Sequence, residues 1–562
     1  MKKNSFITLV VLLVLSISCN KNKLGDTEPV GNEGVEASAG NLNLTLASGQ
    51  LNVVHNSGFE LGTKGNWTNW NDFTVVSNNQ QWGSYCAKLG TRNCSAEQVV
   101  ANLKPNTTYT LSGYVKVVND GDRAYLGVKE FGGVAPNIEI KSPTTSTSYK
   151  LLSVSFTTGP SATSAKIYLW RDGSGTTGGA YGDEVCLSTP NTAKSFWLQL
   201  GSGNPSDAQI YTEAKRRSVV VLNAWEHNLI ARFKNANPNI KVLVYKDLSS
   251  TRSYAVENGA DHQFLPCGVG YQYADTHHPE WFLLDGNNNR LLYDNYAGHY
   301  QMDIGNADYV NYWNSQVINE LNSYGWDGAF LDNALVRANQ YHPEVLPYKY
   351  QTDLSFQNAY RAMLSKVKTV FDQSGKISIA NTSDARLHAG VWNSYMDYLS
   401  GGLDEWWLVF SDSARLQDYS EGWSAQLAEI VSNEAKGKIT LVQPHSGTDD
   451  NEGFYYAFAS YWLANNGNTL FSEQKVTDAY VQPSPWRPQY NWEMGVPCSN
   501  YYQYSQGVYR REFTQAMVIV NANATGGPTS VINLGQACKD EYGNIVTSVT
   551  VPPLTGRILR KM

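Results

Sequence analysis

The chain has 562 residues, too many for one ordinary hydrophobic core, so we expect two or three domains. Its formal net charge is -7 and its lysines and arginines are scattered, which argues against a nucleic-acid partner. Sixteen Trp and 35 Tyr against only 17% charged residues indicate rings that stack on sugars, unless the chain is simply a Tyr-rich exported β protein.

The N-terminus carries two lysines followed by a short apolar run, residues 6–17. This run is too short to span a bilayer as a mature helix and is typical of an export signal. Together with Cys19 it resembles a bacterial lipoprotein signal, in which that cysteine is lipidated and becomes the new N-terminus. The resemblance implies a lipoprotein of the outer membrane, held on its periplasmic or outer face by a lipid anchor. We therefore predict a signal over 1–19 and a flexible tether over 20–50.

Six further cysteines remain, and export makes disulfides available to them. Cys86 and Cys94 are close enough in sequence to close a loop, but the pairing stays open. The chain has no CxxC or HExxH pattern, so we expect no metal or other cofactor in catalysis.

Residues 51–190 alternate polar and apolar positions between turn residues, which predicts a β-sandwich. The opening "NSGFELGTKGNWTNW" and the closing "YGDEVCL" resemble the two ends of jelly-roll carbohydrate-binding modules of families 4 and 9. The resemblance implies a sugar-binding module with a structural calcium ion bound by Glu60 and Asp183. The alternative is a packing domain whose tryptophans are core residues. Which tryptophans face a ligand stays open among these four: Trp67, Trp70, Trp82 and Trp170.

Residues 195–500 alternate eight short apolar segments with helix-like segments, the pattern of a (β/α)8 TIM barrel. An open parallel sheet is the alternative, but no Gly-rich phosphate loop follows the first strand. Residues 505–562 return to strand patterns, and the ending "VTVPPLTGRIL" resembles the small antiparallel β domain that closes many glycosidase barrels. We expect this domain to support the barrel structurally.

Two acidic positions follow predicted barrel strands, and parallel strands direct their carboxyl ends to one face where active sites form. Asp332 ends "GAFLD", and Glu405 follows the Gly pair of "SGGLDEWW". Trp406 would partly desolvate Glu405 and raise its pKa, as a general acid requires. Asn333 and Lys246 would give Asp332 a polar setting that keeps it ionised. Asp404 is an alternative to Glu405.

The motifs "GWDGAFLDN", "YQMDIGNADYVNYW" and "SGGLDEWW" together resemble the hypothetical glycoside-hydrolase-like family 15, which is distantly related to dextranase-type barrels. In the related retaining α-glycosidases, a carboxylate after the fourth strand is the nucleophile and one after the sixth is the acid/base. Carried over, the resemblance makes Asp332 the nucleophile and Glu405 the acid/base.

Other polar or aromatic side chains at strand ends would line the same cup, because each sugar ring offers hydroxyls that need partners once water leaves. We expect about half of them to be helix caps or loop residues instead. The predicted substrate-binding set is Trp225, Lys246, Asp247, Asp303, Asn333, Asn381, Asp384, Trp406, Gln443, His445 and Glu473.

These observations predict a lipid-anchored, monomeric glycoside hydrolase that cleaves an α-linked polysaccharide or oligosaccharide with retention of configuration. Carboxyl groups about 6.5–9.5 Å apart would favour inversion instead, since a retaining pair lies about 5–5.5 Å apart. A rival prediction is a glycan-binding lipoprotein whose barrel has lost catalysis, and a transglycosylase is a third.

Overall fold

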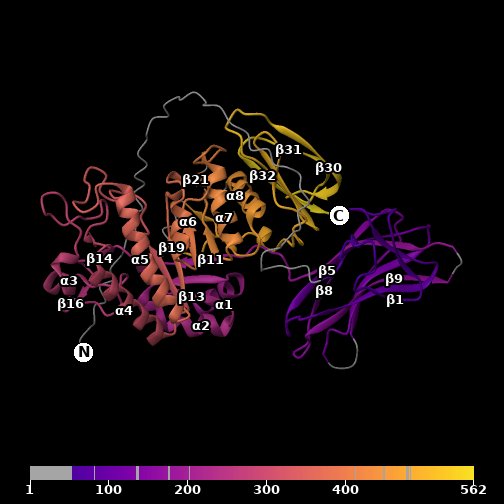
Figure 1. The fold of residues 1–562 in the computed structure, drawn as a ribbon, viewed down its shortest axis with the longest axis horizontal. Helices are drawn as coiled ribbons and strands as arrows, with labels where there is room; N and C mark the ends of the chain where they lie inside the picture. The colour runs from indigo at the N-terminus through magenta and orange to yellow at the C-terminus, as the bar shows by residue number, and fades with distance from the viewer. Residues whose placement is uncertain are drawn as a thin grey trace.

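The computed structural model describes residues 54–562 except 82, 134–137, 175–176, 202, 412, 447–449, 476–479 and 481. The predicted signal, the tether, Cys19 and Trp82 therefore lie outside the described residues. Three parts follow one another along the described chain: a β-sandwich, a helix-surrounded parallel sheet and an antiparallel sheet (Figure 1). None of the described helices has the length and apolar character needed to cross a bilayer.

The β-sandwich consists of two five-stranded antiparallel sheets, in the orders β1-β4-β9-β6-β7 and β2-β3-β10-β5-β8. Alternating apolar side chains of both sheets form one core, which includes Trp67, Leu111 and Ile167. The strands are β1 (Thr68–Trp70), β2 (Phe73–Val76), β3 (Cys86–Leu89), β4 (Arg92–Ala101), β5 (Thr108–Val117), β6 (Arg123–Lys129), β7 (Glu139–Thr144), β8 (Lys150–Thr157), β9 (Ser164–Ser174) and β10 (Ala180–Ser188).

The central part is a nearly closed barrel of eight parallel strands, all eight of which the sequence predicted. Their order in the sheet is their order in the chain, and hydrogen bonds from Phe471 N to Lys194 O (2.9 Å) and from Ser472 Oγ to Phe196 O (2.8 Å) join the last strand to the first. The strands are β11 (Phe196–Gln199), β12 (Val219–Leu222), β13 (Lys241–Asp247), β18 (Gly328–Asp332), β19 (Ile377–Asn381), β20 (Gly401–Asp404), β23 (Ile439–Val442) and β25 (Thr469–Phe471).

Strand side chains alternate between the inside of the barrel and the helices around it. Phe330 packs inside with residues such as Leu243 and Leu441, whereas its neighbours Ala329 and Leu331 pack against the surrounding helices. A side chain at position 328 is excluded, because a Cβ on Gly328 would lie 2.0 Å from Ile377 O of the next strand. This alternation decides which residues at the strand ends can reach a central cavity.

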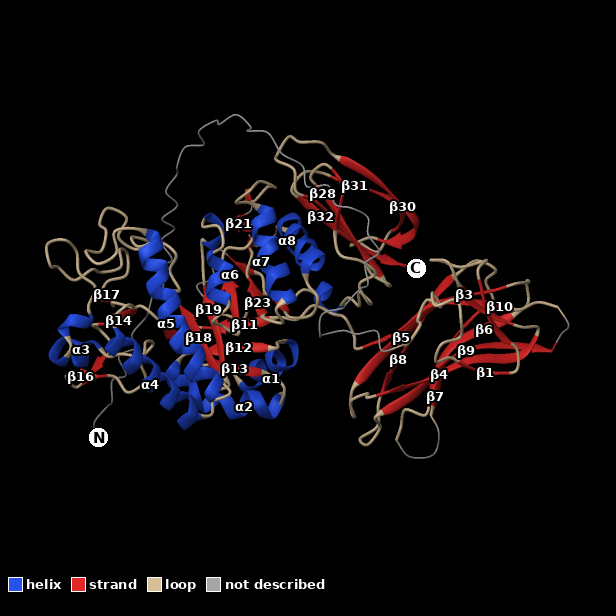
Figure 2. Ribbon diagram, in the orientation of Figure 1, coloured by secondary structure: helices blue, strands red, loops and turns tan. Residues whose placement is uncertain are grey.

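Eight α-helices are described; six of them coincide with helix-like segments of the sequence, whereas the short α3 and α6 were not predicted. Apart from α3, which lies away from the barrel at the left edge of Figure 2, the helices surround the barrel strands drawn in red. α8 is buried on nearly every side because it lies between the barrel and the C-terminal sheet. The helices are α1 (Asp207–Arg216), α2 (Ile230–Ala236), α3 (Tyr271–His277), α4 (Ala307–Tyr324), α5 (Asp353–Gln373), α6 (Val391–Met396), α7 (Trp423–Ala435) and α8 (Asn451–Ala464).

Short strands decorate the loops, and half of them belong to one long connection between β13 and α4 that the sequence did not predict as structured. This connection matters because its residues form one wall of the cavity described below. The short strands are β14 (Ser250–Arg252), β15 (Val256–Glu257), β16 (Ala260–Asp261), β17 (His299–Gln301), β21 (Val409–Ser411), β22 (Ala414–Arg415), β24 (His445–Ser446) and β26 (Gln474–Lys475).

The C-terminal part is an antiparallel sheet of order β27-β28-β29-β32-β30-β31, whose strands β29 and β32 pack on α8. The predicted β domain is thus present and leans on the barrel, as Figure 1 shows. Its strands are β27 (Tyr502–Ser505), β28 (Val508–Glu512), β29 (Ala516–Asn521), β30 (Ser530–Lys539), β31 (Ile545–Val551) and β32 (Thr555–Lys561). The six cysteines that the structure describes are all free thiols.

Candidate active site

A cavity of about 880 Å³ opens at the carboxyl ends of the barrel strands. Asp332 enters it from the end of β18, and Glu405 enters it from the residue after β20. The structure therefore brings together the two carboxylates that the sequence singled out, although 73 residues separate them along the chain.

Asn381, the last residue of β19, lies between the two carboxylates. Its Nδ2 donates to Asp332 Oδ1 at 3.1 Å and to Glu405 Oε2 at 2.9 Å. Asp332 Oδ1 and Glu405 Oε2 are consequently no more than about 6 Å apart. If the two hydrogen bonds follow the N–H bonds of the amide, which make an angle of about 120°, the distance between these oxygens is about 5 Å. The carboxylates are close enough to flank one small group, such as the bridging oxygen of a glycoside.

The carboxylate of Asp332 is held by short hydrogen bonds inside the cavity. Tyr245 donates its hydroxyl to Asp332 Oδ2 at 2.5 Å, and the backbone N–H of Asn333 donates to Oδ1 at 2.9 Å. Burial raises the pKa of Asp332 to about 6, and the charges of Asp247 and Glu405 act in the same direction. The hydrogen bonds from Tyr245 and Asn381 only partly oppose this rise.

The expectation that Lys246 and Asn333 keep Asp332 in a polar setting is wrong. Lys246 is fully buried and points out of the barrel, where its Nζ binds Glu320 of α4 at 2.7 Å. The side chain of Asn333 donates to Asp247 Oδ2 at 2.6 Å, so it supports the neighbouring strand end instead. Asp332 therefore sits in a less polar place than predicted, and its pKa reflects that.

The carboxylate of Glu405 is oriented by a tyrosine that sequence reasoning missed. Tyr480 donates its hydroxyl to Glu405 Oε1 at 2.5 Å and lies 3.3 Å from Gln443 Oε1. Burial and the charge of Glu405 hold the pKa of Tyr480 well above its usual value, so this hydroxyl keeps its proton. The backbone of Tyr480 has a φ of 58°, a left-handed conformation that is strained for a bulky residue.

Asp404 is not the carboxylate that faces the cavity. It is buried on the α7 side of β20, where Gln426 Nε2 donates to its Oδ2 at 2.7 Å. Burial raises the pKa of Asp404 and of the neighbouring Glu429, and the charge of Asp404 raises that of Glu429 further. Of the two acids that the sequence left open, only Glu405 can meet a ligand.

The prediction that Trp406 desolvates Glu405 is also wrong. Trp406 does not line the cavity; its ring stacks on His445 at 3.7 Å between centroids. His445 is buried, and its Nε2 lies 2.9 Å from the backbone oxygen of Glu405. These two residues therefore support the loop that carries Glu405.

Three residues of the predicted substrate-binding set do line the cavity: Trp225, Asn333 and Asn381. Gln443 lies just behind them, next to Tyr480. Asp247 is fully buried and paired with Arg252 at 2.9 Å, so it acts on the site through its charge.

The remaining predicted residues are engaged elsewhere and do not line the cavity, because each pairs with a nearby cation. Asp303 pairs with Lys349 at 2.6 Å and accepts a hydrogen bond from Tyr350. Asp384 pairs with Arg337 at 3.1 Å. Glu473 is buried against Arg487 at 2.6 Å.

The outer end of the cavity is aromatic, as a sugar-binding site requires. Trp225 is 45% exposed, and Tyr254 and Val256 of the β13–α4 connection are nearly as open. Deeper in, Tyr296 lies close enough to both carboxylates that burial and their charges raise its pKa to about 12. Trp225 was predicted from its place after a strand, whereas the high tyrosine content was the only sequence signal for Tyr254 and Tyr296.

The outer face of the β1-β4-β9-β6-β7 sheet carries a second aromatic surface. Trp70, Ser95, Trp170 and Tyr125 occupy directly opposed positions on β1, β4, β9 and β6, so their side chains share one face. Trp70 is half exposed and stacks on Trp170 at 5.4 Å. Trp67, by contrast, is a core residue.

The residues predicted to bind calcium, Glu60 and Asp183, accept backbone N–H groups. Glu60 accepts from Ser84 and Tyr85 at 2.9–3.0 Å, and Asp183 accepts from Gln81 at 2.8 Å. Within the described ranges, no cluster of three or more His, Cys, Asp or Glu side chains could hold a metal ion. These two carboxylates alone do not form a ligand set, and the calcium ion stays a prediction.

Paired carboxylates at the carboxyl ends of parallel barrel strands, with aromatic walls, define a glycosidase-type site. The hypothetical glycosyl hydrolase family 15 matches residues 234–517, and the chain belongs to this family. A carbohydrate-binding domain family matches residues 51–175. The first match confirms the predicted family and with it the predicted class of glycoside hydrolase, and the second confirms the predicted carbohydrate-binding module.

Among characterised relatives, a keratan-sulfate endo-1,4-beta-galactosidase of Sphingobacterium multivorum is 38% identical over 139 residues. This match covers 25% of the chain and 31% of the relative, so the chain spans about a third of that protein's length.

Solved structures with similar chains have low identities. A cycloisomaltooligosaccharide glucanotransferase of Paenibacillus sp. is 10% identical, with 84% of this chain and 68% of that one covered at a TM-score of 0.36. A Clostridium thermocellum endo-1,4-beta-D-xylanase with CBM22-1 and GH10 modules is 13% identical, with 79% and 96% covered at a TM-score of 0.29.

Proposed function

We propose that the chain hydrolyses glycosidic bonds of a polysaccharide or oligosaccharide in the cavity between Asp332 and Glu405, at the mouth of a catalytic (β/α)8 barrel. The observation that carries this proposal is the position of Asn381, whose amide binds both carboxylates and keeps their oxygens within about 6 Å. Two carboxyl groups at this distance, open to an aromatic cavity, are what glycoside hydrolysis needs.

The short separation supports a retaining double displacement rather than inversion. In the first step a carboxylate oxygen of Asp332 forms a bond to the anomeric carbon while the bond to the leaving oxygen breaks. Glu405 gives its proton to that oxygen. In the second step Glu405 takes a proton from water, whose oxygen attacks the anomeric carbon and releases Asp332.

The surroundings of Asp332 bear on this assignment of roles. As a nucleophile Asp332 must be ionised, and with a pKa of about 6 its ionised form predominates only above that pH. The hydroxyl of Tyr245 and the amide of Asn381 stabilise the ionised form. The positive charge that develops on the sugar ring favours it further. If Asp332 were the acid/base and Glu405 the nucleophile, Asp332 would have to be protonated for the first step, and activity would fall above about pH 6.

The linkage has two candidates. Related retaining barrels act on α-glycosides, and this resemblance supports an α-linked substrate. The relative of Sphingobacterium multivorum is by name a keratan-sulfate endo-1,4-beta-galactosidase, which supports a β-galactosidic bond as the second candidate. Substrates of both kinds therefore belong in one assay.

The other parts of the chain complete the proposal. The sandwich would hold the polysaccharide on the face that carries Trp70, Trp170 and Tyr125, where exposed rings can stack on sugars. Lipidation of Cys19 would anchor a monomeric enzyme to the outer membrane. The lysines, the apolar run and the cysteine that follow one another at the N-terminus support this anchor. A calcium ion near Glu60 and Asp183 remains part of this proposal.

The test is hydrolysis of a polysaccharide panel that includes α-glucans and β-galactans, measured as new reducing ends. The wild type should act on at least one of them, whereas Asp332→Ala and Glu405→Gln should lose at least about 100-fold in rate. Saccharide binding without new reducing ends would favour the glycan-binding rival. Full activity in either variant would remove that residue from the mechanism.

A further inference from the structure

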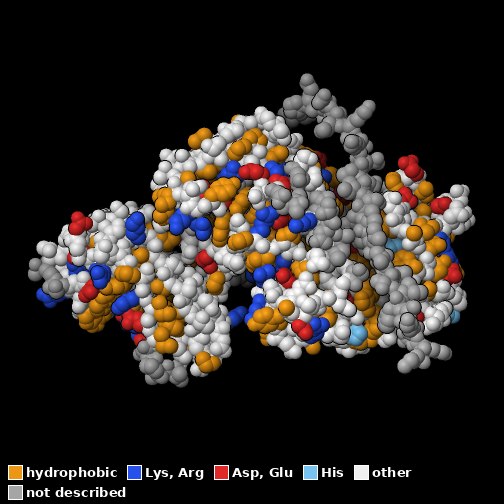
Figure 3. Space-filling model, turned by 180° about the vertical axis from the view of Figure 1, so that it is seen from behind, with side chains coloured by type: hydrophobic (Ala, Val, Ile, Leu, Met, Phe, Trp, Pro, Cys, Tyr) orange, Lys and Arg blue, Asp and Glu red, His pale blue; other side chains and the backbone are white. Residues whose placement is uncertain are grey.

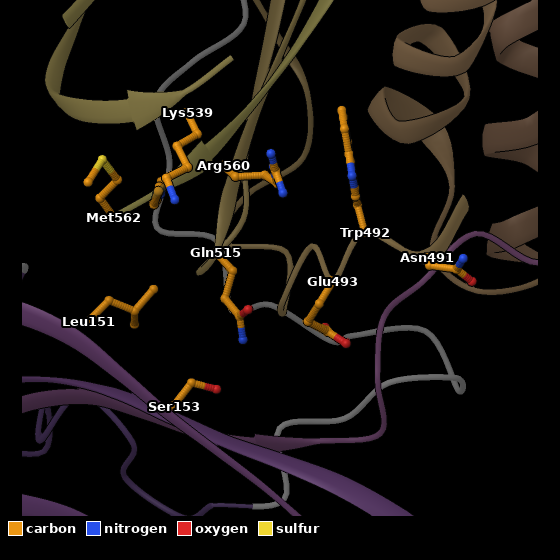
Figure 4. Close-up of a pocket in the computed structure, with 10 residues that line it drawn as sticks. Leu151, Ser153, Asn491, Trp492, Glu493, Gln515, Lys539, Arg560 and Met562 are labelled. Carbon is orange, nitrogen blue, oxygen red and sulfur yellow. The ribbon is translucent and has the colours of Figure 1, made fainter. Parts of the chain in front are cut away.

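A second cavity, of about 550 Å³, lies where the three parts of the chain meet. Figure 4 shows Leu151 and Ser153 of the sandwich on one side, with Trp492, Lys539 and Arg560 opposite them. Several Lys and Arg side chains also lie near this junction in the space-filling view of Figure 3. None of the residues that line this cavity belongs to the candidate active site.

Two cations of this cavity lack a compensating acid. Lys539 of β30 and Arg560 of β32 are directly opposed in the sheet, an arrangement that costs stability when nothing neutralises it. Neither makes an ion pair with any carboxylate in the described part of the chain, and Arg560 Nε is buried without a hydrogen-bond partner. The adjacent Lys561, in contrast, is paired with Glu512 at 2.9 Å.

An aromatic ring stands beside these cations. The guanidinium of Arg560 lies 4.6 Å from the centroid of the Trp492 ring, which is only partly buried. Glu493 follows Trp492, but its oxygens accept backbone N–H groups of Asn191 and Gly495 at 2.9–3.0 Å. Burial raises the pKa of Glu493, and these backbone hydrogen bonds act in the opposite direction.

We propose that this junction cavity is a second saccharide site, one that binds a sugar unit carrying an anionic group, either a sulfate ester or a carboxylate. A guanidinium and an ammonium group together complement the oxygens of such an anion, and the Trp492 ring holds the guanidinium of Arg560 in place. The proposal rests on the proposed function only for the expectation that the ligand is a saccharide.

The active-site cavity, by contrast, favours sugar units without an anionic group. It is lined by Asp332, Glu405 and Glu257, and its Arg252 is neutralised by an ion pair with Asp247. Anionic groups are therefore repelled from the point of cleavage and attracted to the junction. A long polymer with neutral and anionic units would place its neutral units between the two carboxylates.

The experiment measures binding without turnover, by calorimetry on the full-length Glu405→Gln protein. The probes are a sulfated galactan tetrasaccharide, a galacturonate tetrasaccharide and a neutral galactan tetrasaccharide. The double variant Lys539→Gln/Arg560→Gln in this background should bind at least one anionic probe tenfold or more weakly, and the neutral probe within twofold. Loss for the sulfated probe alone identifies a sulfate ester, and loss for the galacturonate alone identifies a carboxylate.

The matched control is Lys241→Gln, which removes an exposed cation at the far end of β13 and should change nothing. Trp492→Leu is a second variant, expected to weaken the same probe while its unfolding temperature stays near that of the parent. No binding of either anionic probe, or equal affinities in parent and double variant, would overturn the proposal. Because the experiment measures affinity, its outcome does not depend on whether the protein hydrolyses glycosidic bonds.

Discussion

Asp332→Asn should make the protein more stable at neutral and alkaline pH and should leave its stability unchanged in acid. Burial and nearby charges raise the pKa of Asp332 from 3.8 to about 6. An acid whose pKa is raised by folding destabilises the folded state once it is ionised. The cost is absent below about pH 4, grows up to pH 6 and is constant above it.

The size of this cost follows from the shift. About two pKa units at 1.36 kcal/mol each correspond to about 3 kcal/mol, and partial contact with solvent reduces this to about 2 kcal/mol. An Asn side chain keeps the shape, since its oxygen can accept from Asn333 N and Asn381 Nδ2 while the Tyr245 hydroxyl turns to accept from its amide. The variant removes the charge and little else.

The assay is thermal unfolding of wild type and variant at pH 4, 5, 6, 7 and 8. At about 2 °C per kcal/mol for a domain of this size, the Tm of the variant should exceed the wild-type Tm by about 4 °C at pH 8 and match it at pH 4. The control Asp372→Asn, on the exposed face of α5, should show no such pH dependence. A gain that is equal at every pH, or a loss at pH 8, would refute the reasoning.

Further outcomes concern the neighbours of the site. Tyr245→Phe removes a hydrogen bond that favours ionised Asp332, so the acidic limb of kcat/KM, expected near pH 6, should move up by about one unit in a pH–rate profile. An acidic limb at the same pH in the variant and the wild type would contradict this role of Tyr245. Tyr480→Phe leaves Glu405 Oε1 without its donor and should lower kcat at least tenfold with a smaller change in KM; unchanged kcat would deny Tyr480 its positioning role. Trp70→Ala should weaken retention on insoluble polysaccharide about tenfold yet spare hydrolysis of a small aryl glycoside, whereas unaltered retention would move sugar binding away from this face.

The barrel strands and the two carboxylates were predictable because they depend on local patterns. Apolar segments of three to seven residues that alternate with helical periodicity favour a parallel sheet, and parallel strands collect their carboxyl ends on one face. The alternation along β13 would even have corrected one error: with Tyr245 inside, Lys246 must point outward to α4. The same rule sends Asp404 away from the cavity.

Other features depend on contacts that no local pattern encodes. Tyr480 reaches Glu405 from a loop after the last barrel strand, in a left-handed backbone conformation that bulky residues seldom adopt. The raised pKa of Asp332 depends first on burial and then on the charge of Asp247, which is paired with Asp332 at the ends of two neighbouring strands. Register and burial of this kind appear only once the strands are assembled.

The central claim is that Asp332 and Glu405 act on one glycosidic bond, the first as nucleophile and the second as acid/base. The most direct measurement is mass spectrometry of the Glu405→Gln protein after reaction with an aryl glycoside whose leaving group needs no acid. Glycosylation should proceed while its hydrolysis stalls, so a glycosyl unit should accumulate on the peptide that contains Asp332. An adduct on another residue, or none while the aryl group is released, would contradict the claim.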